Sequence, residues 1–280
     1  MHKRPPISHQ VNSTPGCGLA DYAGTAVINI IQKLRGEFIF IKTVFIAIGN
    51  MLRGRAMVRK IDILREIDNA GPRAIPIVCL ISFMIGLIIA FVGNMQLKMF
   101  GAEIYVAALV AISMTRILGA VMTGIIMAGR TGASYAAEIG SMRANEEVDA
   151  LTTMGVSPVE FLVLPRVLAL TLTIPILTIV ADIVAIFGGM CVAIMIMNVS
   201  MIEYWRTTLD WITFNNFAIG VLHGWLFGWV IAIIGCRCGM CATKNADGIG
   251  RATTRAVVLG IVGCVVTTAI LTLIFNWIDI

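Results

Sequence analysis

The sequence contains few charged residues. Asp, Glu, Lys and Arg make up only 13% of its 280 residues, whereas soluble domains usually carry about 25%. Hydrophobic residues make up 58%, and the mean hydropathy is +0.91. This composition excludes an ordinary soluble domain and indicates that most of the chain lies in lipid. At about 20 apolar residues per crossing, the length allows five or six spans and no large soluble domain.

Histidines, paired cysteines and phosphate-binding loops are also scarce or missing. The three histidines (His2, His9, His223) lie far from the one cysteine cluster, Cys236–Cys241, so we expect no metal site. Seven cysteines, several of them inside apolar runs, do not form a disulfide framework. No lysine follows a glycine, which excludes a GxxxxGK[ST] loop. The net charge of +5 is spread among loops and does not predict a nucleic-acid partner.

The apolar residues are concentrated in long runs. We therefore expect an all-α integral membrane protein, with a polar tail over residues 1–37 that is not a signal peptide. Residues 38–52 are short for a span and include Lys42, so an interfacial or re-entrant helix is expected there, followed by a basic segment to residue 73. The remainder, 74–280, holds five predicted spans at about 74–97, 104–128, 167–197, 217–235 and 256–277.

Basic residues are distributed unequally between the two sides of these spans. Segments 53–73, 129–166 and 236–255 hold 13 Lys and Arg residues, and the opposite segments hold only Lys98 and Arg206. The positive-inside rule therefore places the first group in the cytoplasm and the C-terminus on the far side of the membrane.

The segment 128–161 is unusual because it carries seven charged side chains between two apolar runs. Asn145 followed by two glutamates predicts a helix start, and Gly155 with Pro158 predicts its end. A short amphipathic helix of about nine residues follows, roughly 14 Å long. It is either a solvated loop or a docking element for a soluble partner, and periodicity alone does not decide between them.

The order of residues from Gly101 to Leu170, "GAEIYVAALVAISMTRILGAVMTGIIMAGRTGASYAAEIGSMRANEEVDALTTMGVSPVEFLVLPRVLAL", resembles the MlaE (YrbE-like) family of ABC transporter permeases. "GIGRATTRAVV" near the C-terminus is similar to that family's last cytoplasmic loop and span. The resemblance implies a bacterial inner-membrane subunit, present in two copies and paired with cytoplasmic ATPase subunits that bind ATP and Mg. It also implies a periplasmic MCE-domain partner and transport of phospholipid between membranes. The family's coupling helix would include Glu138, Arg143, Glu146, Glu147 and Asp149.

Two charges fall inside predicted spans. Arg116 and Asp182 lie near mid-membrane, where a lone charge costs about 2.5 kcal/mol or more. The two either pair and lock two helices, or form a polar point on a lipid-headgroup path. Many family members read Arg-Glu-Leu-Gly-Pro where this chain reads Arg116 to Ala120 as Arg-Ile-Leu-Gly-Ala, which places any role of that glutamate in doubt here.

Two further sets of residues are candidates. Leu97, Phe100 and Glu103 lie at the outer end of the first hairpin, as interfacial anchors or as the mouth of a lipid path. Gly220, Gly224 and Gly228 repeat every four residues and predict close helix packing, within the chain or between subunits. The alternative functions are an ion-coupled secondary transporter using Arg116, Asp182 and His223, or an intramembrane enzyme or assembly subunit.

Overall fold

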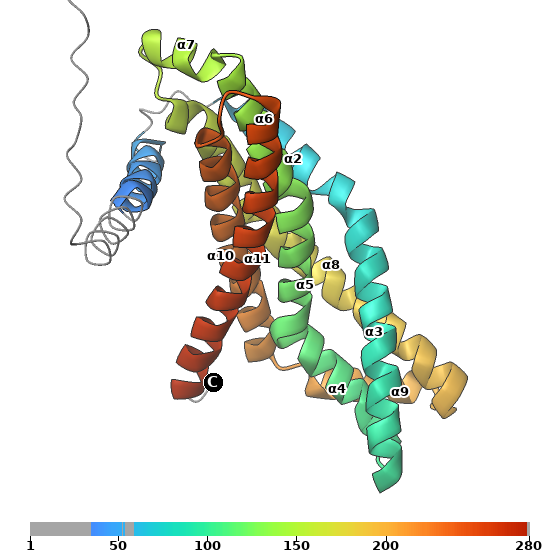
Figure 1. Cartoon of the computed structure of the whole chain (residues 1–280). Coiled ribbons are helices and arrows are strands. Elements are labelled where there is room, and N and C mark those ends of the chain that lie inside the picture. The colour runs from blue at the N-terminus through green and yellow to red at the C-terminus, as the bar shows by residue number, and fades with distance from the viewer. Residues whose placement is uncertain (1–34, 52, 54–58, 279–280) are drawn as a thin grey trace, which may run out of the picture. The chain divides into compact units, whose positions relative to one another are not determined.

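A computed structural model describes residues 35–51, 53 and 59–278 (Figure 1). The polar tail predicted for residues 1–37 lies outside the described residues as far as residue 34. The chain divides into two units, Met1–Thr43 and Val44–Ile280. Residues 35–51 form a helix that includes residues 38–51 of the segment predicted as interfacial or re-entrant. All elements discussed below belong to the second unit.

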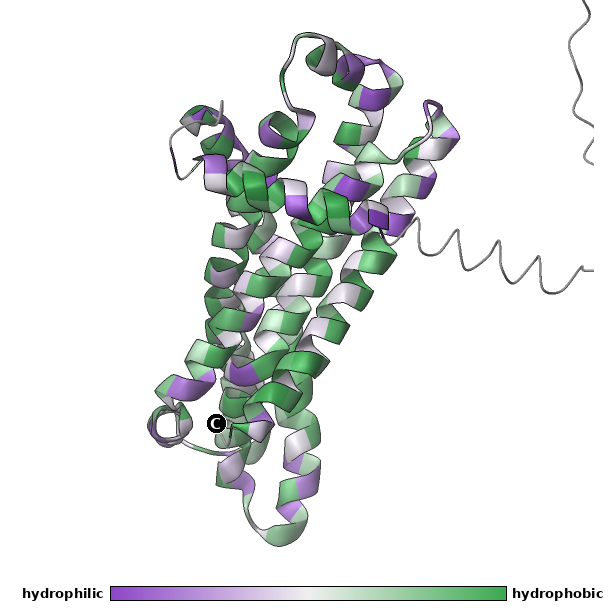
Figure 2. Cartoon of the chain, turned by 90° about the vertical axis from the view of Figure 1, so that its left-hand side faces the viewer, coloured by the Kyte–Doolittle hydropathy of each residue, from purple (hydrophilic) through white to green (hydrophobic). Residues whose placement is uncertain are grey.

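The second unit is helical throughout its described part and contains no strand there. Five helical runs are long and apolar enough to cross a membrane, which confirms the predicted all-α membrane architecture. They are Ile61–Phe100, Glu103–Ala144, Val159–Met197, Phe214–Met240 and Ala246–Trp277. Figure 2 shows hydrophilic residues gathered near both ends of the helices and hydrophobic residues along their middle parts.

The first run begins with α2 (Lys60–Ala70), continues through the 3-10 turn η1 (Pro72–Ala74) and then forms α3 (Ile75–Leu97). Short 3-10 turns, η2 (Lys98–Phe100) and η3 (Glu103–Tyr105), close the first hairpin, where Gly101 adopts a left-handed φ of 65°. The remaining elements follow in the order α4 (Val106–Ser113), η4 (Met114–Leu118), α5 (Gly119–Met127), η5 (Ala128–Gly132), α6 (Ala133–Ala144), α7 (Glu147–Thr153), η6 (Val159–Val163), α8 (Leu164–Met197), α9 (Met201–Trp211), α10 (Phe214–Met240) and α11 (Ala246–Trp277).

The second span continues much further than the sequence predicts. Gly129 and Gly132 do not interrupt the helix, because both lie in η5, a π-helical turn that joins α5 to α6 without a break. The missing side chain of Gly132 instead allows close packing: a Cβ there would lie 3.1 Å from Cγ2 of Ile231, and Gly235 faces its backbone. The loop between the second and third spans is therefore reduced to residues 145–158.

The short helix in that loop also starts later than predicted. Asn145 is the C-cap of α6 rather than the N-cap of α7, and the N-cap position is held by Glu146 in a left-handed conformation with φ 62°. Because α6 extends to Ala144, α7 has seven residues instead of about nine. The predicted end is confirmed, since Gly155 has a φ of 75°.

The core is built around α8, which packs along α3 and α10. Glycines let these backbones approach closely, as expected where packing rather than hydrophobicity joins helices in lipid. The structure places Gly220 against the carbonyl of Thr115, Gly224 against Thr178 and Gly228 against Thr171, so all three pack within the chain. By contrast, only 11% of the apolar window of α11 is buried inside the chain.

Candidate coupling surface and intramembrane polar residues

The acidic helix α7 stands at the end of the molecule that carries most of the basic residues (Figure 1). Val148 is its buried side chain, with 8% of its surface exposed. Glu146, Glu147 and Asp149 are all exposed. α7 therefore buries Val148 and partly buries Leu151, while its three carboxylates remain exposed. This arrangement suits a contact with another protein.

Two of those carboxylates are engaged by a lysine almost a hundred residues away. Lys244, in the loop between α10 and α11, places its Nζ 3.1 Å from Oε1 of Glu146 and 2.8 Å from Oδ2 of Asp149. The loop is ordered by Asn245, whose side chain accepts the backbone N–H of Gly248 at 2.9 Å and caps α11. In the sequence, Lys244 is one of the basic residues of segment 236–255, and nothing there indicates this clamp.

The clamp defines a pH dependence. The hydrogen bond from Lys244 lowers the pKa of Asp149 below 3.8, and the bonds to Asp149 and Glu146 raise the pKa of Lys244 above 10.5. Because the pKa of Asp149 is lowered in the folded state, the clamp contributes stability at pH values above the unfolded pKa of Asp149. This stability is lost as the pH falls through the folded pKa. Because the pKa of Lys244 is raised in the folded state, the clamp contributes stability at pH values below the unfolded pKa of Lys244. This stability is lost as the pH rises through the folded pKa. The clamp is therefore intact between about pH 4 and about pH 10.

We expect spin labels at Glu147→Cys and Thr243→Cys, in a background without the native cysteines, to give a narrow distance distribution at pH 7. The distribution should broaden once the pH falls below the lowered pKa of Asp149 and in 1 M salt, because protonation of Asp149 removes the ion pair and salt screens exposed charges. Lys244→Ala should broaden it at pH 7 as well. A distribution that is equally narrow in Lys244→Ala would show that α7 is held by Val148 alone.

Glu138 and Arg143 lie on α6 rather than α7. Arg143 is half-buried in the last turn, and its charge contributes to the lowered pKa of Asp149. Glu138 points to Arg166, near the start of α8, where Oε2 lies 3.0 Å from Nη2. Arg166 also lies 3.5 Å from Oε1 of Glu66 on α2 and donates from Nη1 to the carbonyl of Leu162 at 2.8 Å.

This cluster is a junction of three helices. The Arg166 side chain is only 10% exposed, and its Cζ lies 5.5 Å from the centre of the Tyr135 ring. Separating the buried guanidinium of Arg166 from its two carboxylate partners is strongly unfavourable, because removing one partner leaves the other charges uncompensated. α2, α6 and α8 are therefore tied together directly beneath the coupling segment. Glu138 is a candidate from the sequence, whereas its partners Arg166 and Glu66 are found only in the structure.

The two intramembrane charges have different surroundings. Arg116 lies in η4, and its Nη1 donates to Oδ1 of Asn216 on α10 at 3.0 Å. Asp182 is buried on α8 against Gly119, and its Oδ1 has no hydrogen-bond partner among the described residues. His223 is also buried, with Nδ1 2.8 Å from the carbonyl oxygen of Ile219. Arg116 therefore contacts Asn216 on α10, and its pairing with Asp182 stays a prediction.

At the opposite end, Phe100 is 81% exposed, and Leu97 and Glu103 are partly exposed. The three residues stay together around the Gly101 turn, as the sequence predicts from their spacing. Their side chains form a rim beside exposed Met99.

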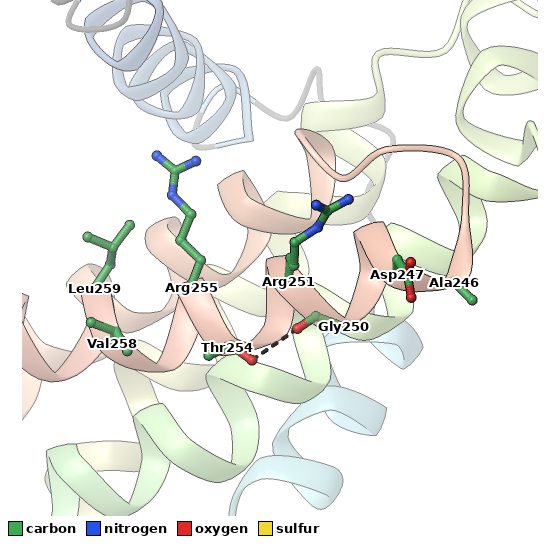
Figure 3. Close-up of a pocket in the computed structure, with 8 residues that line it drawn as sticks. All are labelled: Ala246, Asp247, Gly250, Arg251, Thr254, Arg255, Val258 and Leu259. Atoms are coloured by element: carbon green, nitrogen blue, oxygen red, sulfur yellow. Dashed lines mark hydrogen bonds between the residues drawn. The ribbon is translucent and has the colours of Figure 1, made fainter.

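A basic surface lies on the exposed face of α11. Figure 3 shows Arg251 and Arg255 projecting from the same side of the helix, over a shallow depression of about 750 Å³. Exposed Val258 and Leu259 continue the surface along the helix. Cations beside exposed aliphatic side chains are typical of a membrane–water interface. The six described cysteines are free, and no group of three or more His, Cys, Asp or Glu in the described part of the chain is placed to hold a metal ion.

Comparison with known families identifies the chain. The model of the family described as Permease MlaE matches residues 63–274, from α2 to the last turn of α11. The chain belongs to the MlaE permease family. A probable ABC transporter permease protein of Rickettsia typhi is 35% identical over 240 residues, which cover 86% of this chain and 91% of the relative. A probable ABC transporter permease protein of Synechocystis is 30% identical over 227 residues, covering 81% and 84%.

A plant protein is also similar to this MlaE permease. Protein TRIGALACTOSYLDIACYLGLYCEROL 1, chloroplastic, of Arabidopsis thaliana is 28% identical over 216 residues, which cover 76% of this chain and 61% of the relative. The resemblance predicted from residues 101–170 is therefore confirmed. An MlaE permease is an integral membrane subunit of an ABC transporter, and it requires an ATPase partner. The matched region includes α7, Lys244 and the Arg166 cluster.

Proposed function

We propose that this MlaE permease moves phospholipid between the inner and outer membranes of a bacterium, driven by ATP that a separate ATPase subunit hydrolyses with Mg. In this proposal, the chain is a non-catalytic subunit of the inner membrane that works as a pair. A periplasmic MCE-domain lipid-binding protein receives or delivers the lipid. The basic ends of the helices face the cytoplasm, and the C-terminus faces the periplasm.

The observation that carries the proposal is the family match together with the exposed acidic helix at the basic end. A transporter without a phosphate-binding loop needs a surface that a motor protein can move. Glu146, Glu147 and Asp149 supply three carboxylates on such a surface, and Glu138 with Arg143 connects it to α6 and α8. The name of the Arabidopsis relative refers to a galactolipid, which supports a lipid as the transported molecule.

The coupling residues are proposed to act as one unit. The ATPase would push on α7, which is attached through Val148 and the Lys244 clamp to both α6 and the α10–α11 loop. Movement would then reach Arg166 at the start of α8 through Glu138. Arg116, Asp182, Leu97, Phe100 and Glu103 are proposed to contact the lipid on its route through or around the span.

Reconstitution tests the proposal against its alternative. Proteoliposomes that contain the chain with its ATPase and a periplasmic acceptor protein should transfer fluorescent phospholipid only when ATP and Mg are present. The chain alone should transfer none, with or without a proton gradient. Gradient-driven transfer by the chain alone would instead support the ion-coupled transporter that uses Arg116, Asp182 and His223.

A further inference from the structure

A polar cavity lies between α2 with η1 on one side and η5 with α6 on the other. Its volume is about 350 Å³, a size within the usual range of about 300 to 1,000 Å³ for ligand pockets. Two arginines, Arg73 and Arg130, and two glutamates, Glu66 and Glu138, line it together. A cavity with both signs of charge fits a ligand that itself carries both signs.

The cationic side of the cavity retains free donors. Arg130 uses Nη1 to donate to the backbone carbonyl of Asn69 at 3.3 Å, and a guanidinium has five N–H donors in all. Arg73 is exposed, and its contact with Asp68 is long, at 3.7 Å, and solvent-accessible on both sides. Exposed ion pairs of this kind contribute little to the free energy of folding, and their side chains change partners easily. Two guanidiniums are thus available to an anion, and their forked geometry matches a phosphate.

The anionic side is held in place from behind. Arg166 contacts both Glu66 and Glu138, and Ser134 donates to Oε1 of Glu138 at 3.1 Å. These contacts fix the positions of the carboxylates but leave acceptor capacity, since each ionised carboxylate offers about four lone-pair sites. An ammonium group in the cavity could therefore be bound by preorganised acceptors.

A buried hydroxyl points independently to a ligand. Tyr135 lines the cavity and is only 2% exposed, and its hydroxyl faces the Glu66 carboxylate without forming a regular hydrogen bond to it or to any other described residue. Buried side-chain polar groups normally have a partner, so an orphaned one requires an explanation. A polar group bound in the cavity supplies that partner.

The position of the cavity favours a lipid over a free solute. Arg73 directly precedes α3, which enters the apolar layer with Ile75 and Ile77 39% and 42% exposed. A headgroup in the cavity would leave its acyl chains free to lie along this part of α3.

We propose that this cavity binds the headgroup of a phospholipid that carries both a phosphodiester and a primary ammonium. The phosphate contacts Arg73 and Arg130, the ammonium contacts Glu66 and Glu138, and the Tyr135 hydroxyl bonds to the headgroup. This headgroup is the one that the proposed lipid transporter would carry. Only this biological role of the site rests on the proposed transport function. Binding itself requires neither nucleotide nor transport.

Native mass spectrometry of the purified complex, without nucleotide, measures the binding. We expect phosphatidylethanolamine to be retained about tenfold more strongly than phosphatidylglycerol, which lacks the ammonium, or phosphatidylcholine, whose quaternary ammonium donates no N–H bond. Tyr135→Phe and Arg73→Gln should each weaken retention about tenfold, since each removes a hydrogen bond to a charged group. The matched controls Tyr105→Phe and Arg206→Gln, exposed at the other end of the molecule, should leave it unchanged.

The outcomes distinguish a phospholipid headgroup from free phosphoethanolamine as the ligand of this cavity. Competition by O-phosphoethanolamine at similar concentrations would assign the site to the free solute and overturn the lipid assignment. Equal retention of the three lipids, or unchanged retention in Tyr135→Phe with an unaltered melting temperature, would overturn the site itself. Lipid transfer that fails while selective retention persists would contradict the proposed transport function but not this site.

Discussion

Gly228→Ala should lower the free energy of unfolding by about 3 kcal/mol, the upper end of the usual cost of overpacking. A Cβ at this position would lie 2.6 Å from Cα of Thr171 and 2.8 Å from the carbonyl oxygen of Leu170. Both atoms belong to the backbone of α8, so no side-chain rotation can relieve the clash. Because α8 forms the centre of the core, the two helices would have to move apart. Thermal unfolding in detergent, followed by size-exclusion chromatography, measures the loss.

The chain provides a matched control. Gly250, in the first turns of α11, would present its Cβ to open space, since nothing lies within 4 Å. Gly250→Ala should therefore be neutral or stabilise the helix by up to about 1 kcal/mol, the ordinary difference in helix propensity. If both variants melt at the temperature of the parent, the tight α8–α10 contact is not formed in the folded protein.

The triple variant Glu146→Lys, Glu147→Lys, Asp149→Lys should lose the co-purifying ATPase by more than tenfold. It reverses all three exposed carboxylates of the proposed coupling surface, and it also repels Lys244 from α7. The single variant Glu147→Lys isolates the partner contact, because Glu147 takes no part in the Lys244 clamp. We expect it to reduce co-purification severalfold while the clamp remains intact. Pull-down of the ATPase with the tagged permease gives the readout.

The controls for this experiment distinguish surface charge from position. Glu203→Lys and Asp210→Lys on α9 make the same kind of change at the opposite end of the molecule, and both residues are exposed. They should retain the ATPase fully. Full retention in the triple variant as well would remove α7 from the contact and leave the Arg251 and Arg255 surface as the remaining candidate.

The sequence predicted five membrane-spanning helices because each contains a continuous apolar run long enough to cross a bilayer. It predicted the end of α7 because Gly155 and Pro158 act locally. It did not predict the continuation of the second span through η5, since a glycine used for close packing against Ile231 reads the same as a glycine used for a bend. Local composition does not distinguish the two uses.

The candidate site was predicted only in its local half. Acidic residues 146, 147 and 149 were recognisable from their order, but Lys244 is 95 residues from Asp149, and Arg166 is 28 residues from Glu138. Such pairs depend on how helices are arranged, which hydropathy does not specify. The same reason explains why the contact between Arg116 and Asn216 was not predicted. Asn216 is an uncharged polar residue 100 positions away, whereas Asp182 is a candidate from the sequence because it is charged.

The π-helical turns η4 and η5 affect how the second span should be read. Such a turn takes up one residue more than an α-helical turn, and each residue advances the helix by about 100°. A helical wheel drawn from Val106 to Ala144 therefore loses phase twice, by a total of about 200°. Deleting a single residue from 114–118 would therefore turn η4 into an α-helical turn and leave Glu138 at the same azimuth, beside Arg166.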